Sequence, residues 1–172
     1  MKIKTGFAVL KKRIMDAVAL ETEEARAKAS AAFRAEAGRH KRYMAAVGAG
    51  TYFGESFNAL MKAVFEPLNV PEYKYGAEVF EITGISDKVY RGMRNGKADY
   101  SPSHRTVTAL CAGFDFDISI AEGLLQRCGR SFSNSDEHIA LRIILTAYRG
   151  CGVTERNDYL EAMGYGRLTD DK

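Results

Sequence analysis

Between positions 82 and 97 the chain reads Ile82-Thr-Gly-Ile-Ser-Asp-Lys-Val-Tyr-Arg-Gly-Met-Arg-Asn-Gly-Lys97. Gly84 interrupts a helical pattern, and Ser86 is a residue type that caps the start of a helix. We therefore expect a helix from about Glu72 to Thr83, a sharp turn at Gly84, and a short helix from Asp87 to Arg94. Two helices joined by a tight turn are the parts of a helix-turn-helix, whose second helix can lie in the major groove of DNA.

The second of these helices is expected to have two different faces. Helical spacing puts an apolar set on the side that packs against the other helices: Val79, Ile85, Tyr90 and Met93. The opposite side is polar and is expected to face the solvent, with Asp87, Lys88, Arg91 and Asn95. The pair Asn95-Gly96 predicts a left-handed turn at the end of the helix.

The rest of the chain favours further helices, and no strand pattern is convincing. Proline is scarce, with 3 residues in 172, and tryptophan is absent. Glycine, proline and capping residues separate the apolar stretches. Ser133-Asn-Ser135 marks one helix start, and the apolar segment Ile139–Leu145 that follows should be buried. We expect an all-α fold whose other helices cover Glu55–Phe65, Thr106–Ala112, Ile118–Cys128, a segment after Ser135, and Glu155–Met163. Five residues of the first of these helices are expected to face inward: Phe57, Leu60, Met61, Val64 and Phe65.

Positive charge is concentrated at the N-terminal end. Residues 1–50 hold 11 lysines and arginines against 5 acidic residues, whereas residues 51–172 hold 14 against 17. No proline occurs between Gly6 and Val47, and an apolar stripe runs over Phe7–Val18 at helical spacing. We expect a basic arm of one long helix or two shorter ones, which is suited to contacts with phosphate.

Several classes of protein lack support in the sequence. No apolar run approaches the roughly 18 residues that a membrane span needs, and signal-peptide features are missing, so we expect a cytoplasmic protein. The unequal spacing of Cys111, Cys128 and Cys151 indicates reduced, mostly buried thiols. His40 and the other two histidines, His104 and His138, share no ligand-like spacing, so we expect no metal and no cofactor.

Catalysis also lacks a motif. Asp115-Phe-Asp117 is similar to a metal-binding pair of carboxylates, but it lies between two expected helices, where acids act as caps. No serine, histidine and aspartate set is placed for nucleophilic catalysis. We therefore do not expect an enzyme.

Together with the helices after it, the glycine turn resembles the XRE, or lambda-repressor-like, family of helix-turn-helix regulators. The resemblance over residues 72–129 lies in Thr83-Gly-Ile-Ser86, Tyr90, Met93, Gly96, Pro102 and the helix Thr106–Phe114. Residues 129–168 resemble a C-terminal extension of some bacterial and phage members, through Leu141–Tyr148 and Tyr159–Gly164. The chain is thus expected to be a lambda-repressor-like helix-turn-helix bundle with a basic arm (residues 1–50), a DNA-binding domain (residues 51–129) and a C-terminal helical extension (residues 130–172).

The resemblance implies a set of DNA contacts by position. The residues that face the bases would be Ser86, Asp87, Lys88, Arg91 and Asn95. Arg91 would contact guanine in a bidentate manner, and Lys88 would contact a second guanine or a phosphate. Asp87 could accept from cytosine or, equally, stabilise the helix N-terminus. The phosphate backbone would be held by Lys74, Arg94, Lys97 and Arg105.

One phenylalanine and two glycines bear on these expected DNA contacts. Phe80 stands where the family usually has alanine, at the close approach of the two helices. Gly76 stands where a glutamine often contacts phosphate. Gly92 lies inside the second helix, where glycine costs about 1 kcal/mol relative to alanine.

The predicted function is that of a sequence-specific transcription regulator, a repressor that binds double-stranded DNA as a homodimer. The candidate dimer interfaces are Leu141–Leu145 and the Phe7–Val18 stripe, and the basic arm is expected to add nonspecific DNA affinity. The alternative is a protein-interaction module of the same shape, such as an antitoxin, adaptor or phage inhibitor. Phe80, Gly76 and the negative charge of residues 51–172 favour this alternative. A membrane-surface role of the arm is a third reading.

Overall fold

The computed structural model describes residues 23–169, which contain helices and no strand. This confirms the predicted all-α class. The chain divides into two compact units, residues 1–41 and residues 42–172. The helices are α2 (Glu23–Ala49), α3 (Phe53–Phe65), α4 (Tyr75–Thr83), α5 (Asp87–Asn95), α6 (His104–Gly113), α7 (Ile118–Gln126), α8 (Asp136–Thr146) and α9 (Val153–Ala162), with short 3₁₀ helices η1 (Glu66–Leu68) and η2 (Glu72–Lys74) before α4.

Within the described residues of the first unit, the chain is a helix with mostly exposed side chains. Most side chains from 25 to 41 are exposed, including Phe33, and Arg39 pairs with Glu36 one turn earlier. Alanine makes up much of this stretch, so its helical propensity is high while its capacity to bury apolar area is low. The predicted Phe7–Val18 stripe lies outside the described residues.

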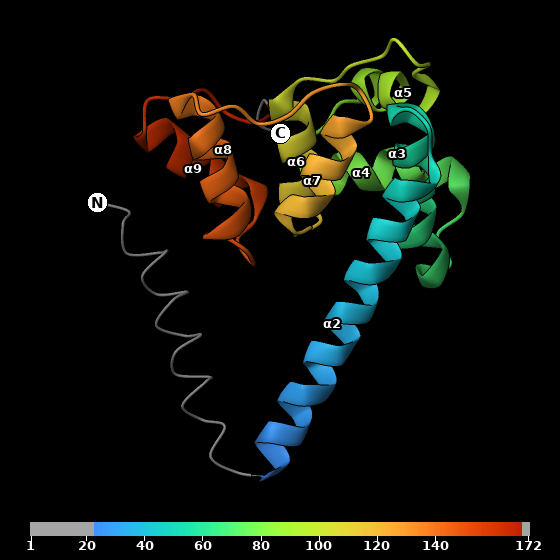
Figure 1. The fold of residues 1–172 in the computed structure, drawn as a ribbon, viewed down its shortest axis with the longest axis vertical. Coiled ribbons are helices and arrows are strands. Elements are labelled where there is room, and N and C mark those ends of the chain that lie inside the picture. Colours follow the sequence, from blue (N-terminus) through green and yellow to red (C-terminus); the bar gives the residue numbers. More distant parts are fainter. Residues whose placement is uncertain (1–22, 170–172) are drawn as a thin grey trace. The chain divides into compact units, whose positions relative to one another are not determined.

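The second unit has one core to which α3 to α9 all contribute. Helices α6 and α7 lie at its centre, with α3, α4 and α5 on one side and α8 and α9 on the other (Figure 1). The five residues of α3 that the sequence pointed inward are all buried, as predicted: Phe57, Leu60, Met61, Val64 and Phe65.

The last turns of α2 belong to this second unit and contribute to its core. Val47 is buried, and the Tyr43 ring packs edge-on against Phe116 with the ring centroids 5.1 Å apart. The Ser56 hydroxyl donates to the Val47 carbonyl at 2.8 Å, which ties α3 to the end of α2. Part of the predicted arm is therefore also a core element. No helix within residues 23–169 has the length and apolar character to cross a membrane.

The structure confirms the predicted turn and cap at the start of α5 but not the predicted turn at its end. Gly84 has a left-handed φ of 74°, which suits glycine, and Ser86 accepts from the Val89 amide to cap α5. The predicted left-handed turn at Asn95-Gly96 is wrong, because Gly96 has φ −60° and ψ 127°. Glycine is needed there for space: a Cβ would lie 2.6 Å from the Tyr100 ring.

Helix α8 begins where the sequence predicts, but not all of its apolar residues are buried. Ser135 caps it by accepting from the His138 amide. Ile139 is exposed, because only one side of the helix faces the core. Leu141 and Leu145 lie on the buried side and are fully covered by the chain itself. Leu141 and Leu145 therefore offer no surface to a second copy, so neither can take part in the predicted dimer interface.

Candidate nucleic-acid interface

Helices α4 and α5 are joined by three residues, 84 to 86, and their connection is closely tied. The Gly84 amide donates to the Phe80 carbonyl at 2.8 Å. The Thr83 hydroxyl donates to the Val79 carbonyl at 2.6 Å and accepts from the Ile85 amide at 3.0 Å. The predicted apolar set of Val79, Ile85, Tyr90 and Met93 is buried.

Close glycine contacts hold α5 against its neighbours. A Cβ on Gly76 would lie 3.0 Å from the Tyr90 ring, so glycine at this position of α4 leaves room for that ring. A Cβ on Gly54 of α3 would lie 2.2 Å from the Gly96 carbonyl oxygen, at the end of α5. The Asn58 side chain donates to the Arg94 carbonyl at 2.9 Å. These contacts fix α5 through packing and backbone hydrogen bonds rather than through charge.

The five residues that the sequence assigned to base contacts all lie at the exposed side of α5: Ser86, Asp87, Lys88, Arg91 and Asn95. Two of them form an ion pair within the helix, with 2.8 Å between the Arg91 Nη2 and Asp87 Oδ2 atoms. Both side chains are largely solvated, at 71% and 62% exposure. The spacing of four residues brings the pair together on one helical side.

The structure separates the four residues that the sequence assigned to phosphate contacts. Lys74 and Lys97 are exposed, and the structure shows no ion pair for them within residues 23–169. Arg94 pairs with Glu72 of η2, with the Arg94 Nη2 atom 2.9 Å from Glu72 Oε1. Arg105 lies on α6, where it pairs with Glu137 of α8 at 2.7 Å and donates to the carbonyls of Gly166 and Arg167.

Apolar side chains are exposed on and before α4. Phe80 and Ile82 are each 38% exposed, and Leu68 and Tyr73 in the preceding 3₁₀ turns are more exposed still. In the structure the close approach of α4 and α5 lies at Gly76 and Tyr90, so Phe80 is accommodated at the surface. The flank of α4 is thus more apolar than the exposed side of α5.

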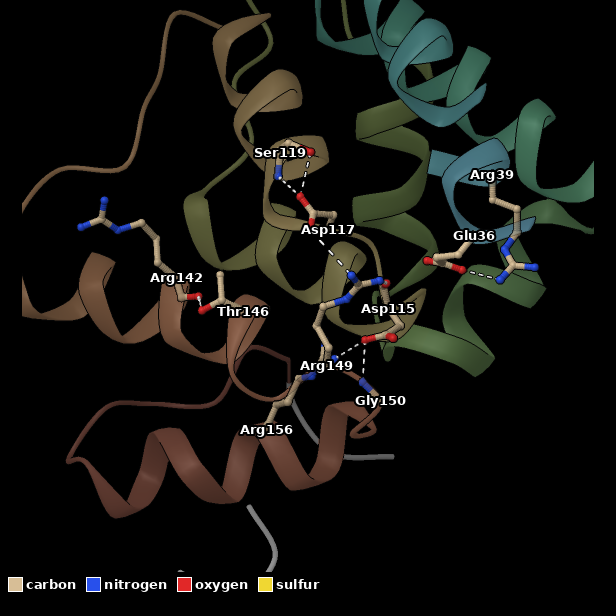
Figure 2. A network of polar contacts seen from close by, with 10 residues as sticks. All are labelled: Glu36, Arg39, Asp115, Asp117, Ser119, Arg142, Thr146, Arg149, Gly150 and Arg156. Atoms are coloured by element: carbon tan, nitrogen blue, oxygen red, sulfur yellow. Dashed lines mark hydrogen bonds and ion pairs between the residues drawn. The ribbon is translucent and has the colours of Figure 1, made fainter. Parts of the chain in front are cut away.

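A second polar cluster joins the turn between α6 and α7 to the C-terminal helices (Figure 2). Arg156 of α9 is fully buried, and its Nη2 atom donates to Asp115 Oδ1 at 2.6 Å. The same carboxylate oxygen accepts from the Gly150 amide at 2.8 Å. Arg149 donates to the Asp115 carbonyl at 3.3 Å and lies 3.7 Å from Asp117. Asp117 caps α7 as predicted, by accepting from the Ser119 amide.

Two histidines that are far apart in sequence meet at the start of α6 and α8. The ring centroids of His104 and His138 are 4.0 Å apart, and Phe132 packs edge-on against His138. The Ser133 amide donates to His138 Nδ1 at 2.9 Å, which requires that nitrogen to be unprotonated. Burial and the neighbouring His104 lower the pKa of His138.

Neither the histidines nor the cysteines form a metal centre in the part of the chain that the structure describes. No group of three or more His, Cys, Asp or Glu side chains is placed there to hold a metal ion. All three cysteines are free thiols, and Cys111 and Cys151 are buried, as predicted. Burial raises the pKa of the Cys111 thiol, which therefore stays protonated near neutral pH.

Comparison of the chain with protein-family models, curated proteins and solved structures finds no match. Sequence reasoning did not find the carboxylate partners of the two α5 arginines. The four-residue spacing of Asp87 and Arg91 is a usable signal, because helical neighbours at that spacing pair. No local pattern connects Glu72 with Arg94, which are 22 positions apart.

Proposed function

We propose that this protein is a sequence-specific double-stranded DNA-binding regulator that places α5 in the major groove. The observation that carries the proposal is the two-sided character of α5: Tyr90 and Met93 are buried, while Lys88 and Arg91 are exposed on a helix that follows a three-residue turn. A helix presented in this way can bring its N-terminal residues to the base edges.

The proposed contacts divide between bases and backbone. Arg91 is assigned the bidentate guanine contact, and Lys88 a second guanine or a phosphate. Lys74, Arg94 and Lys97 are assigned to phosphates, where they set register. Arg105 is a weaker candidate for a phosphate, because its guanidinium already binds Glu137 and two carbonyl groups of the C-terminal segment.

Retardation of duplex DNA tests this proposal directly. We expect the purified protein to bind random duplexes at low salt, with an affinity that falls steeply as salt rises, and to enrich one sequence from a random pool. Lys97→Ala should weaken binding to all sequences alike and reduce the salt slope by about one unit. Failure to bind any duplex at low salt would contradict the proposal.

We also propose that the regulator binds as a homodimer, because one recognition helix makes few contacts for operator-grade affinity. The buried Leu141 and Leu145 do not take part in this contact. Light scattering with and without operator DNA measures the mass of the species. A monomer at high micromolar concentration under both conditions would rule out the dimer.

The basic first unit is proposed to add nonspecific affinity. Lys28, Arg34 and Lys41 are exposed on α2 and can reach phosphates without unfolding the core. Changing all three to glutamine should weaken binding to random and selected duplexes by similar factors, mainly at low salt. The substitutions leave Tyr43 and Val47 in place, so the core contacts of α2 are kept. Unchanged affinity at low salt would contradict this role.

A second candidate function is a protein-interaction module. The exposed Phe80 and Ile82 favour it, and so do the internal ion pairs that partly neutralise the arginines of α5. Under this alternative the protein binds no duplex at low salt, and Phe80→Ala leaves its thermal unfolding nearly unchanged while it abolishes capture of a protein partner. Retained DNA binding by Phe80→Ala, with a normal salt slope, favours the regulator.

A further inference from the structure

Glu72 occupies a position from which it controls one cation of the α5 surface. Its side chain leaves η2, the 3₁₀ turn before α4, and its Oε1 atom lies 2.9 Å from Arg94 Nη2 in the last turn of α5. Both side chains are accessible to solvent, with exposures of 54% for Glu72 and 42% for Arg94. The pair therefore lies at the surface where α5 would meet DNA.

A carboxylate and a phosphate present similar groups to a guanidinium. Each offers negatively charged oxygens to the planar N–H fork of arginine, and arginine binds both by charge-assisted hydrogen bonds. An exposed ion pair of this kind is weak, since solvent screens it. Arg94 can therefore leave Glu72 for a phosphate, but only by giving up the bond that it has.

We propose that Glu72 is an internal competitor of DNA phosphate for Arg94, and that it limits the affinity of the α5 surface for any duplex. The proposal rests on the proposed DNA-binding function. Because the competition concerns a phosphate contact, it lowers the affinity for random and selected sequences by the same factor. Glu72 thus affects DNA binding only through Arg94.

The structure also argues against a purely structural role for the pair. The end of α5 is already held by the Asn58 bond to the Arg94 carbonyl and by the contact of Gly54 with Gly96. The helix therefore does not depend on the Glu72 carboxylate for its position. If it did, removal of the carboxylate would lower both the stability of the fold and the affinity for DNA.

Glu72→Gln in the full chain tests the competition. Binding is measured by fluorescence anisotropy with a labelled random-sequence duplex of about 20 base pairs. The variant should bind about two- to fivefold more tightly at low salt, the size expected for release of an exposed ion pair. Glu78→Gln is the matched control: it removes a charge of the same sign from α4, and it should change affinity much less, because Glu78 itself makes no ion pair within residues 23–169.

A double-mutant cycle separates release of Arg94 from a general charge effect. In an Arg94→Gln background, Glu72→Gln should give no gain, and thermal unfolding of each variant checks that the fold is intact. A gain that persists without Arg94, or no gain when Arg94 is present, overturns the proposal. If neither the wild type nor Glu72→Gln binds any duplex, the DNA-binding function itself fails. If the wild type binds and Glu72→Gln binds equally, only the competition fails.

Discussion

The α5 surface and the junction of α9 with the α6–α7 turn use the same chemical pair in two different ways. On α5, Asp87 and Arg91 lie 2.8 Å apart with exposures of 62% and 71%. At the junction, Asp115 and Arg156 lie 2.6 Å apart, and Arg156 has no exposed area at all (Figure 2). One pair lies within a single helix, whereas the other joins residues that are 41 positions apart.

The two arginines differ in whether they can exchange their carboxylate for another acceptor. Water replaces a solvated partner at little cost, so Arg91 is able to exchange Asp87 for another acceptor. Arg156 has no such alternative, because a buried cation without its carboxylate is strongly destabilising. Its Nε atom also donates to the Tyr148 carbonyl at 3.1 Å, so it secures the turn between α8 and α9. The first pair suits recognition and the second holds the fold together.

The largest expected effect is that of Arg156→Ala. Loss of the buried guanidinium removes the ionic partner of Asp115, frees the Tyr148 carbonyl and leaves a cavity. It should lower the free energy of unfolding by about 3–5 kcal/mol. Urea denaturation measures this loss of unfolding free energy. Arg91→Ala is the matched control and should change stability by less than about 0.5 kcal/mol. Similar losses for the two variants would contradict the distinction between the pairs.

The next effect concerns the packing that holds α5. If the ion pairs of α5 are exchangeable, its position depends on close contacts such as that of Gly54 with the Gly96 carbonyl. Gly54→Ala should therefore lower the free energy of unfolding by about 1–3 kcal/mol through overpacking. Gly48→Ala, where a Cβ meets no atom within 4 Å, should leave stability unchanged or raise it slightly. A thermal melt of each variant gives the comparison, and a neutral Gly54→Ala would show that packing does not fix α5.

The third effect is that of Arg91→Ala on the DNA binding proposed for α5. The substitution should cost about 1–3 kcal/mol of binding to a selected operator and relax the preference at one base position. Binding to random duplexes should decrease less, since phosphate contacts remain. Titrations of operator and random DNA at one salt concentration measure both effects. Wild-type discrimination by this variant would show that Arg91 does not read a base.

The smallest effect is expected at the pair of histidines, which are intermediate in exposure. Burial and His104 lower the pKa of His138 below its usual 6.5, so the folded state disfavours the protonated ring. The unfolded chain then binds more protons as the pH falls, and this contribution is present above pH 6.5 and lost below it. Unfolding measured at pH 7.5 and about pH 5.5 should show a larger loss for the wild type than for His138→Gln. Equal losses would assign the acid sensitivity to other groups.

Local sequence patterns were enough to predict much of the fold. Ser86, Asp117 and Ser135 each cap the helix that the sequence predicted after them. A cap needs only the two or three residues that follow it, so its signal is contained in the sequence. The buried sides of α3 and α5 were also readable, because helical spacing alone decides which residues share a side.

Contacts between elements were not readable in this way, and they decided the character of the site. Gly96 carries the sequence signal of a left-handed turn, yet it serves a close approach to Gly54 and Tyr100. Leu141 and Leu145 have the composition of an interface, yet the core covers them. Both outcomes depend on which helix packs alongside, and a single helix contains no information about its neighbour.

Local sequence patterns predicted most of the helices to within a few residues, the apolar sides of α3 and α5, and the charges on α5. Tertiary structure alone decided that Arg94 faces Glu72, that Arg156 is buried on Asp115, and that His104 meets His138. The physical reason is the distance along the chain over which each kind of interaction acts. Capping and helical spacing act within a turn or two of the chain, whereas an ion pair between distant positions exists only after packing has brought the two elements together.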